Sequence, residues 1–280
     1  MKKQKNKESL SLRFLYGTLI GRLILRLLTA RWVSRLVGAF LDSRLSLPLI
    51  RRFVKKNGID LSEYYSDDFR CFNDCFTRKI KEDLRPIDET PCALIAPCDG
   101  LLSAYEITPD ARFTVKGREY TVESLLNDRE LAEKYFGGVC LVFRLCVNHY
   151  HRYVYVDNAS KGDNVFIKGR LHTVRPIALE KTPVFKENCR EYTVMETENF
   201  GAVTQIEVGA LLVGKIKNHH RLATVKRGEE KGMFLYGGST VILLLEKGSA
   251  VMREELFTAT EGGEETSVRM GERLGTKEKG

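Results

Sequence analysis

Residues 234–245 read FLYGGSTVILLL, and this stretch predicts two β-strands joined at a pair of glycines. Apolar, strand-forming residues stand on both sides of the G-G-S-T tetrapeptide, and residues 241–245 contain no polar side chain. A hairpin turn is the ordinary explanation for two glycines at such a place. The alternative is a reactive backbone, because Gly238 has no Cβ and gives the peptide bond to Ser239 unusual conformational freedom.

The same β-prone texture extends over most of the chain from about residue 93. Short apolar runs alternate with turn-forming residues, as in GVCLVFRLC (138–146) and HRYVYV (151–156). Earlier in the chain the spacing is helical, and the apolar side chains between Phe69 and Ile80 predict a helix that ends before Pro86. The sequence therefore predicts an α+β protein, with a helical region over residues 1–90 and a mostly antiparallel β core over residues 91–280.

The positive charge of the chain is concentrated at its start. The whole chain has a formal charge of +8, yet residues 1–56 contain fourteen Lys and Arg and only two acids, so the remainder is negative. Such an asymmetry indicates that one end of the molecule meets an anionic partner.

Arginine recurs among leucines over residues 21–41, which read GRLILRLLTARWVSRLVGAFL. Arg22 and Arg26 share one helical face, and Arg31 and Arg35 share a nearly opposite one, so we expect two amphipathic helices that break near Thr29–Ala30. The longest uncharged run at the start of the chain, Phe14 to Gly21, is far shorter than the ~20 residues of a membrane-spanning helix. The composition is typical of helices lying in an anionic lipid surface. A basic helix packed on its own domain or on nucleic acid is the alternative.

The seven cysteines include no C-x-x-C pair and no zinc-like spacing. Several lie in apolar runs, so we expect buried, reduced thiols in a cytosolic protein and no metal site.

Ser239, a histidine and an aspartate are the candidates for a reactive group. His149 and His151 are two residues apart on an expected strand and therefore point to the same face. Asp99 lies in a tight APCDG turn. If the Ser239 hydroxyl attacks the preceding carbonyl, an N→O shift gives an ester. Elimination then leaves dehydroalanine, which hydrolyses to a pyruvoyl group, a built-in electron sink.

Further blocks accompany the G-G-S-T motif in a fixed order. They are FNDCFTRKIKEDLRP (72–86), APCDG (96–100), YHRY (150–153), LHTVRPIAL (171–179), the segment 183–216 and MGERLG (270–275). Together with KGMFLYGGSTVILLLEKG (231–248), these blocks resemble the pyruvoyl-dependent phosphatidylserine decarboxylase family, and the basic start resembles its longer bacterial members. The resemblance covers essentially the whole chain.

The resemblance implies a proenzyme that cleaves itself between Gly238 and Ser239. The products would be a β chain (1–238) and an α chain (239–280) that begins with the pyruvoyl cofactor. Asp99, His151 and Ser239 are expected to form the self-cleavage relay. The mature enzyme would convert phosphatidylserine to phosphatidylethanolamine and carbon dioxide through a Schiff base, as a step of phospholipid biosynthesis. It would lie on the cytoplasmic side of the cell membrane as a peripheral protein that binds anionic phospholipid and no nucleic acid. A homo-oligomer remains open.

Several positions depart from the family pattern. His149 replaces a frequent Asp, Val154 replaces a second histidine, Arg175 replaces a frequent Asn, and Cys75 replaces a usual Phe. Because Val154 cannot transfer a proton, we expect His151 to be the base, with His149 or His172 as the alternatives. Two functional alternatives remain: a non-catalytic protein that binds membranes or nucleic acid, and the same chemistry on another amino-phospholipid.

Overall fold

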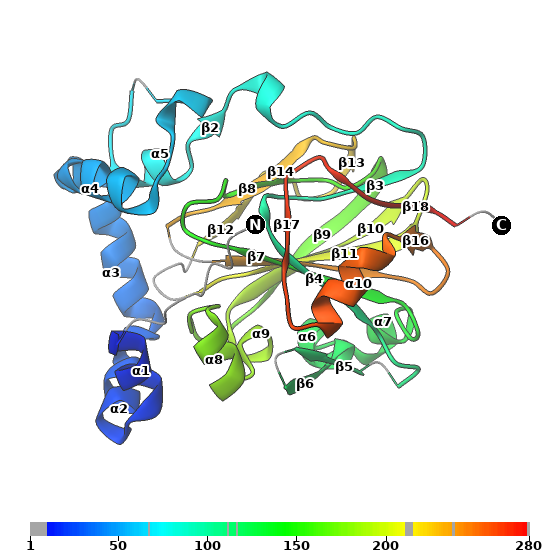
Figure 1. Ribbon diagram of the computed structural model, residues 1–280, viewed down its shortest axis with the longest axis horizontal. Coiled ribbons are helices and arrows are strands. Elements are labelled where there is room, and N and C mark those ends of the chain that lie inside the picture. The colour runs from blue at the N-terminus through cyan, green and yellow to red at the C-terminus, as the bar shows by residue number, and fades with distance from the viewer. Residues whose placement is uncertain are drawn as a thin grey trace.

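The computed structural model describes residues 10–66, 68–110, 112–115, 117–210, 215–236 and 239–278. Its first part is helical and stands at one side of the molecule (Figure 1). The helices there are α1 (Leu10–Gly17), α2 (Leu19–Leu28), α3 (Arg31–Leu41), α4 (Leu47–Asn57) and α5 (Phe72–Phe76). The predicted break near Thr29–Ala30 is confirmed, because these two residues separate α2 from α3. No helix in the described ranges is long and apolar enough to cross a membrane.

The prediction of one helix from Phe69 to Ile80 is wrong in its extent. Only α5 is helical, and Lys79–Ile80 forms strand β2, which pairs with β1 (Tyr64–Tyr65). Arg78 explains the early end of the helix. Its buried guanidinium donates to the backbone carbonyls of Asn148 and His149, at 3.0 and 3.3 Å. These tertiary contacts override the helical spacing of the apolar residues.

The core contains a large antiparallel sheet, which confirms the predicted α+β class. Within the described residues it has eight strands in the order β13-β9-β10-β11-β15-β7-β4-β17. Their bounds are β4 (Gly100–Glu106), β7 (Val139–Leu145), β9 (Ala159–Ile167), β10 (Arg190–Thr197), β11 (Gly201–Val208), β13 (Ala223–Val225), β15 (Ser239–Leu245) and β17 (Thr266–Val268). Strand β15, which begins at Ser239, is thus inside the sheet, between β11 and β7.

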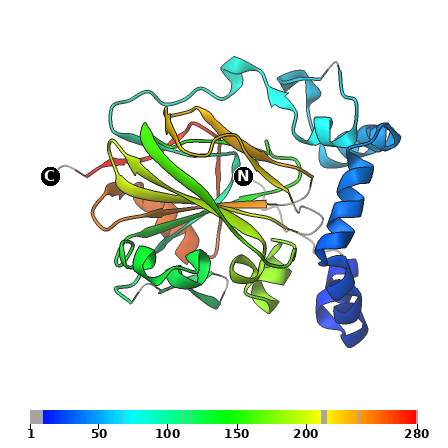
Figure 2. The same cartoon turned by 180° about the vertical axis from the view of Figure 1, so that it is seen from behind.

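Both faces of this sheet are covered, so β15 is buried along its whole length. Val241 and Leu243 face one apolar cluster, and Ile242 and Leu244 face the other, as the period of two requires. Short helices cover the second face, as Figure 2 shows. They are α6 (Val122–Leu126), α7 (Arg129–Glu133), α8 (Pro176–Lys181) and α9 (Val184–Glu187). Continuous burial explains why residues 241–245 contain no polar side chain.

Smaller sheets cover the first face of the large sheet. One has the order β12-β14-β8 and another β16-β18-β3. Strands β5 and β6 form a hairpin that belongs to the cluster on the second face. The bounds of all these strands are β3 (Ala93–Ile95), β5 (Arg112–Val115), β6 (Arg118–Thr121), β8 (Arg152–Val154), β12 (Ile216–Asn218), β14 (Glu230–Phe234), β16 (Ala250–Met252) and β18 (Arg273–Lys277). Helix α10 (Glu254–Glu261) packs beside β4. The chain therefore leaves the small sheet at the end of β14 and enters the large sheet at Ser239.

Candidate active site

Ser239 is the first residue of β15 and is fully buried. Its Cα lies opposite Leu145, the last residue of β7. The Oγ atom has no hydrogen-bond partner among the described residues, which is unusual for a buried hydroxyl. The predicted cleavage-site residue Gly238 lies outside the described residues.

Asp99 immediately precedes β4 and lies at the same end of the sheet as Ser239. Leu101 of β4 pairs with Arg144 of β7, and Ser239 pairs with Leu145. Strands β4 and β15 therefore begin on either side of the end of β7, roughly 10 Å apart, because neighbouring strands are about 4.8 Å apart. The sheet brings the predicted aspartate and serine to one edge.

A clamp of two donors holds the Asp99 carboxylate. Arg85 Nε lies 2.7 Å from Oδ1, and Arg85 Nη2 lies 2.5 Å from Oδ2. The backbone N–H of Met270 also donates to Oδ1 at 2.9 Å. Such bidentate pairing fixes a carboxylate in one orientation. Sequence reasoning missed Arg85, whose only signal was its place in the LRP end of the block 72–86.

His149 lies in the turn that follows β7 and shares a cavity with Asp99. Its Nδ1 accepts the backbone N–H of Cys146 at 3.2 Å, so the neutral ring carries its proton on Nε2. Burial lowers the pKa of His149, and the nearby Asp99 carboxylate partly offsets this effect. A cavity of about 270 Å³ has Asp99, Arg85 and His149 in its wall.

His151 is fully buried beside the strand that leads to Ser239. Its Nδ1 lies 2.9 Å from the backbone carbonyl of His149, which places the proton on Nδ1 and the lone pair on Nε2. The ring packs against Phe76 with 4.1 Å between centroids, and its own carbonyl accepts the N–H of Phe234 in β14. A backbone carbonyl, and not the Asp99 carboxylate, therefore fixes this tautomer.

Of the other positions considered in the sequence, Val154 lies near Asp99, whereas His172 lies near α1. Val154 is buried in β8, and its N–H donates to the carbonyl of Pro97, two residues before Asp99. His172 packs under α1, where Nδ1 lies 3.4 Å from the Tyr16 hydroxyl and Nε2 lies 3.4 Å from Glu187. Burial lowers the pKa of His172, and Glu187 partly offsets the effect. The seven thiols are free, and five are buried, as expected for reduced cysteines.

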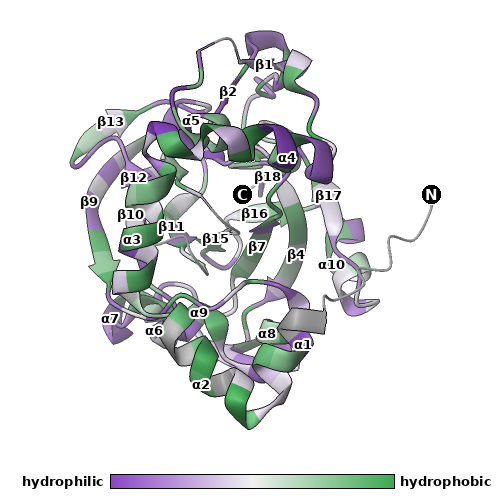
Figure 3. Cartoon of the chain, turned by 90° about the vertical axis from the view of Figure 1, so that its left-hand side faces the viewer, coloured by the Kyte–Doolittle hydropathy of each residue, from purple (hydrophilic) through white to green (hydrophobic). Residues whose placement is uncertain are grey.

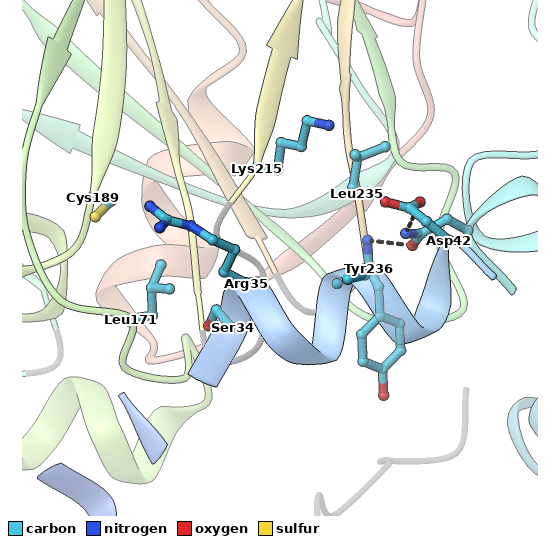
Figure 4. A pocket seen from close by; sticks show the side chains of 11 residues that line it. Ser34, Arg35, Asp42, Leu171, Cys189, Lys215, Leu235 and Tyr236 are labelled. Carbon is cyan, nitrogen blue, oxygen red and sulfur yellow. Dashed lines mark hydrogen bonds between the residues drawn. The ribbon is translucent and has the colours of Figure 1, made fainter. Parts of the chain in front are cut away.

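A second cavity of about 420 Å³ lies between α3 and the core, next to the chain that leads to Ser239. Figure 4 shows Arg35 from α3 and Lys215, which precedes β12, reaching it from two elements. Neither cation has an ion-pair partner in the described part of the chain. Ser34 also lines the cavity, and its buried Oγ has no partner there either. The wall also contains the acid Asp42, so its cations exceed its acids by one. This balance suits a ligand that is anionic and accepts hydrogen bonds.

Two contacts connect this cavity to the segment upstream of Ser239. The Tyr236 N–H donates to Asn73 Oδ1 at 3.2 Å, and Asn73 Nδ2 donates to Asp42 at 2.6 Å. The Tyr236 ring packs edge-on against Phe72 and Phe76. Helix α5 thus holds the chain three residues before the serine. Apart from the position of α5 in the block 72–86, no feature of the sequence indicated this role.

No group of three or more metal-ligating side chains occurs within the described ranges. The described site contains a buried serine hydroxyl, two histidines and a clamped carboxylate near one end of β7, and these are residue types that enzymes use for proton transfer and nucleophilic attack. A family model described as phosphatidylserine decarboxylase matches residues 72–276. The chain belongs to the phosphatidylserine decarboxylase family.

Similar curated proteins extend over nearly the whole chain. "Phosphatidylserine decarboxylase proenzyme 2" of Clostridium acetobutylicum is 44% identical over 97% of this chain and 94% of its own length. "Phosphatidylserine decarboxylase proenzyme" of Clostridium botulinum is 41% identical over 95% and 92%. The protein of that name from Clostridium beijerinckii is 39% identical over 94% and 90%. The match includes the basic helices as well as the β core.

Proposed function

We propose that this chain cleaves itself between Gly238 and Ser239 and then decarboxylates phosphatidylserine to phosphatidylethanolamine, as a step of phospholipid biosynthesis. Family membership supports the reaction. The observation that carries the self-cleavage is the state of Ser239, whose buried hydroxyl has no hydrogen-bond partner among the described residues. A hydroxyl that is already desolvated and makes no competing contact is prepared to attack the neighbouring peptide carbonyl.

In the proposed cleavage, Ser239 Oγ attacks the carbonyl carbon of Gly238 while His151 Nε2 accepts the hydroxyl proton. The C–N bond breaks, the Ser239 nitrogen takes a proton, and an ester joins the two residues. Loss of the Ser239 α-proton then expels the Gly238 carboxylate and leaves dehydroalanine. This residue tautomerises to an imine, adds water and releases ammonia, which leaves a pyruvoyl group. His151 suits the role of base because its Nδ1 proton is held by the His149 carbonyl.

The surroundings of Ser239 fit a pyruvoyl group. The group supplies a ketone that condenses with the substrate amine and accepts the electron pair released when carbon dioxide leaves. Arg35 and Lys215 are two cations for the two anionic groups of the substrate headgroup, its phosphodiester and its carboxylate. We propose that they orient the headgroup in the 420 Å³ cavity, with the amine toward residue 239.

We also propose that α1–α4 lie on an anionic membrane, at the cytoplasmic side of the cell membrane. Most exposed large apolar side chains in the described part of the chain are on this region: Phe14, Leu19, Ile20, Leu23, Ile24, Trp32, Leu36, Phe40, Leu45, Leu47 and Leu49. Figure 3 views the side of the molecule that carries these helices and shows hydrophobic stretches on α2 and α3. Helix α3 carries Trp32 and lines the cavity through Arg35, so a lipid headgroup could enter directly from the surface.

These roles divide the chain at about residue 90, into a membrane-associating part and a catalytic part. The division is functional, because α5 of the first part holds Tyr236 of the second. After cleavage, the two pieces would stay associated without a covalent bond, because β15 of the smaller piece pairs with β11 and β7 of the larger one.

Intact mass spectrometry of the purified 280-residue protein tests the proposal. We expect two pieces that end and begin at residues 238 and 239, with the smaller one blocked at its N-terminus and reactive with a carbonyl reagent. The protein should release carbon dioxide from phosphatidylserine vesicles, and Ser239→Ala should remain whole and inactive. A wild-type chain that stays whole and releases no carbon dioxide would overturn the proposal. Release from another amino-phospholipid alone would overturn the substrate assignment.

A further inference from the structure

Lys231 and Glu207 form a fully buried ion pair between the two sheets that the chain connects at Ser239. Lys231 Nζ, from β14 of the small sheet, lies 2.7 Å from Oε1 of Glu207, from β11 of the large sheet. Neither side chain is exposed to solvent at all. The mechanism proposed above uses neither group.

A polar network surrounds the pair. Asn218 of β12 accepts from Lys231 at 3.1 Å and donates to Glu207 Oε2 at 3.2 Å and to Glu191 of β10 at 2.7 Å. Tyr153 of β8 donates to Asn218, and Gln205 of β11 donates to Glu207 Oε1. All three strands of the small sheet and two strands of the large sheet therefore contribute to this network, which cross-links the sheets.

The cross-link lies beside the proposed cleavage site. Val208 pairs with Thr240, so the residue opposite Ser239 is Gly209. Glu207 is therefore the diagonal neighbour of Ser239, on the same face of the sheet. Such neighbours are about 7–8 Å apart. Glu207 is also paired through its backbone to Val241 of β15, while its side chain holds Lys231 of β14. One residue thus contacts the strand before the 238–239 bond and the strand after it.

Stability alone does not account for this pair. Two apolar side chains of similar volume are often as stabilising as a buried ion pair, or more so, because both charges lose their hydration. A hydrogen-bonded pair differs from an apolar pair in fixing distance and direction. The proposed cleavage needs such precision, since the attacking oxygen must approach the carbonyl carbon to about 3–3.5 Å.

We propose that Lys231 and Glu207 are positioning residues for self-cleavage, which lock β14 onto β11 and thereby hold the 238–239 bond in a reactive geometry. This inference rests on the proposed self-cleavage of the chain. It assigns to the pair no proton transfer and no contact with the substrate.

The double variant Lys231→Met/Glu207→Leu separates positioning from stability. We expect this variant to melt near the wild-type temperature. It should cleave itself roughly 100-fold more slowly, because a displacement of the attacking oxygen by about 1 Å lowers the rate by that factor. Cleavage of this folded variant within about twofold of the wild-type rate would overturn the inference while leaving the proposed function intact. A wild-type protein that never cleaves would instead overturn the proposed function.

Glu207→Gln is a second variant for the case that the double variant does not fold. This substitution keeps the shape of the side chain but places an amide N–H₂ group where Glu207 Oε2 accepts from the Asn218 amide. We expect self-cleavage to slow about tenfold, which corresponds to an activation barrier about 1.4 kcal/mol higher. An unchanged rate in this variant would also overturn the inference. The matched control is Asp157→Asn, which weakens the buried ion pair of Asp157 with Arg227. Asp157 also accepts the backbone N–H of Asn199, which precedes β11 at the end of the strand far from Val208. This control variant should lose thermal stability and cleave at the wild-type rate.

Discussion

Arg85 binds both carboxylate oxygens of Asp99, with contacts of 2.7 and 2.5 Å, and both side chains are about nine-tenths buried. The pair joins the segment after α5 to the turn before β4, where the predicted aspartate lies. Asp99 is therefore a fixed charge at the edge of the sheet, and any role of this carboxylate depends on Arg85.

The first prediction concerns this clamp. Arg85→Met should destabilise the fold by about 3 kcal/mol, because it leaves a buried carboxylate without its partner. Self-cleavage should slow as well, since Asp99 loses its fixed orientation. Urea unfolding and the rate of cleavage measure the two effects. Arg112→Met removes exposed pairs and should change neither; an Arg85 variant that behaves the same way would show that the clamp is unimportant.

The second prediction compares the histidines. His151→Ala should slow self-cleavage about 100-fold or more, because removal of a general base costs 10²–10⁴ in rate. His172→Ala should cleave normally, since its ring contacts Tyr16 of α1 and Glu187. His149→Ala tests the alternative base, whose ring shares a cavity with Asp99. The accumulation of full-length chain is measured over time. Slow cleavage in the His149 variant together with normal cleavage in the His151 variant would reassign the base.

The third prediction concerns pH. Burial lowers the pKa of His149, so the folded state binds fewer protons than the unfolded state near the ordinary histidine pKa of about 6.5. The stabilising effect of the neutral ring is complete above about pH 6.5 and is lost as the pH falls toward the lowered value. His149→Asn should therefore show a shallower loss of stability on acidification than the wild type. Urea midpoints from pH 5 to 8 measure this, and identical slopes would refute it.

The sequence predicted the parts of the fold that depend on local pattern. The break at Thr29–Ala30 followed from the angular positions of arginines on a helix, and the buried strand β15 followed from an uninterrupted apolar run. The helix over 69–80 failed because Arg78 finds carbonyl partners about seventy residues away, in the turn before His151. Hydrophobic spacing contains no information about such a contact.

The candidate site shows the same limit. Asp99 and Ser239 could be selected because they stand in distinctive turn and strand contexts, and the sheet brings both to the end of β7. The Arg85 clamp and the His149 carbonyl that orients His151 could not be predicted, because both contacts depend on tertiary geometry. Arg35 and Lys215 are ordinary surface cations in the sequence. They become candidates only when the fold places them around one cavity.

The fourth prediction tests this cavity. Arg35→Gln and Lys215→Gln should each raise KM for phosphatidylserine about tenfold, equivalent to about 1.4 kcal/mol, because each removes a cation from the proposed headgroup site. Self-cleavage should continue, since it involves no lipid. Lys217→Gln is the control, because Lys217 is exposed on β12 two residues from Lys215 and does not line the cavity. Equal KM values for the Lys215 and Lys217 variants would remove the cavity from substrate binding.

The last prediction concerns the membrane. Removal of residues 1–56 would disturb the catalytic part as well as membrane binding, because Phe53 of α4 packs on Phe72 and Phe76 beside Tyr236. Trp32 and Leu36 are better targets, since they are 58% and 64% exposed and one turn apart on α3. Trp32→Ser/Leu36→Ser should leave the fold and self-cleavage unchanged. It should weaken binding to phosphatidylserine-containing vesicles by tenfold or more, because each apolar side chain is worth about 1.5–3 kcal/mol when fully buried.

Two comparisons make the membrane test specific. Leu222→Ser changes a residue that is 71% exposed outside the helical region, and it should bind vesicles as the wild type does. Raising the salt from 0.05 to about 0.5 M should weaken wild-type binding, because screening shortens the reach of the basic residues of α1–α4. If the α3 variant and the Leu222 variant bind equally well, α3 does not lie on the lipid surface. The exposed apolar residues of the helical region would then require a protein partner instead.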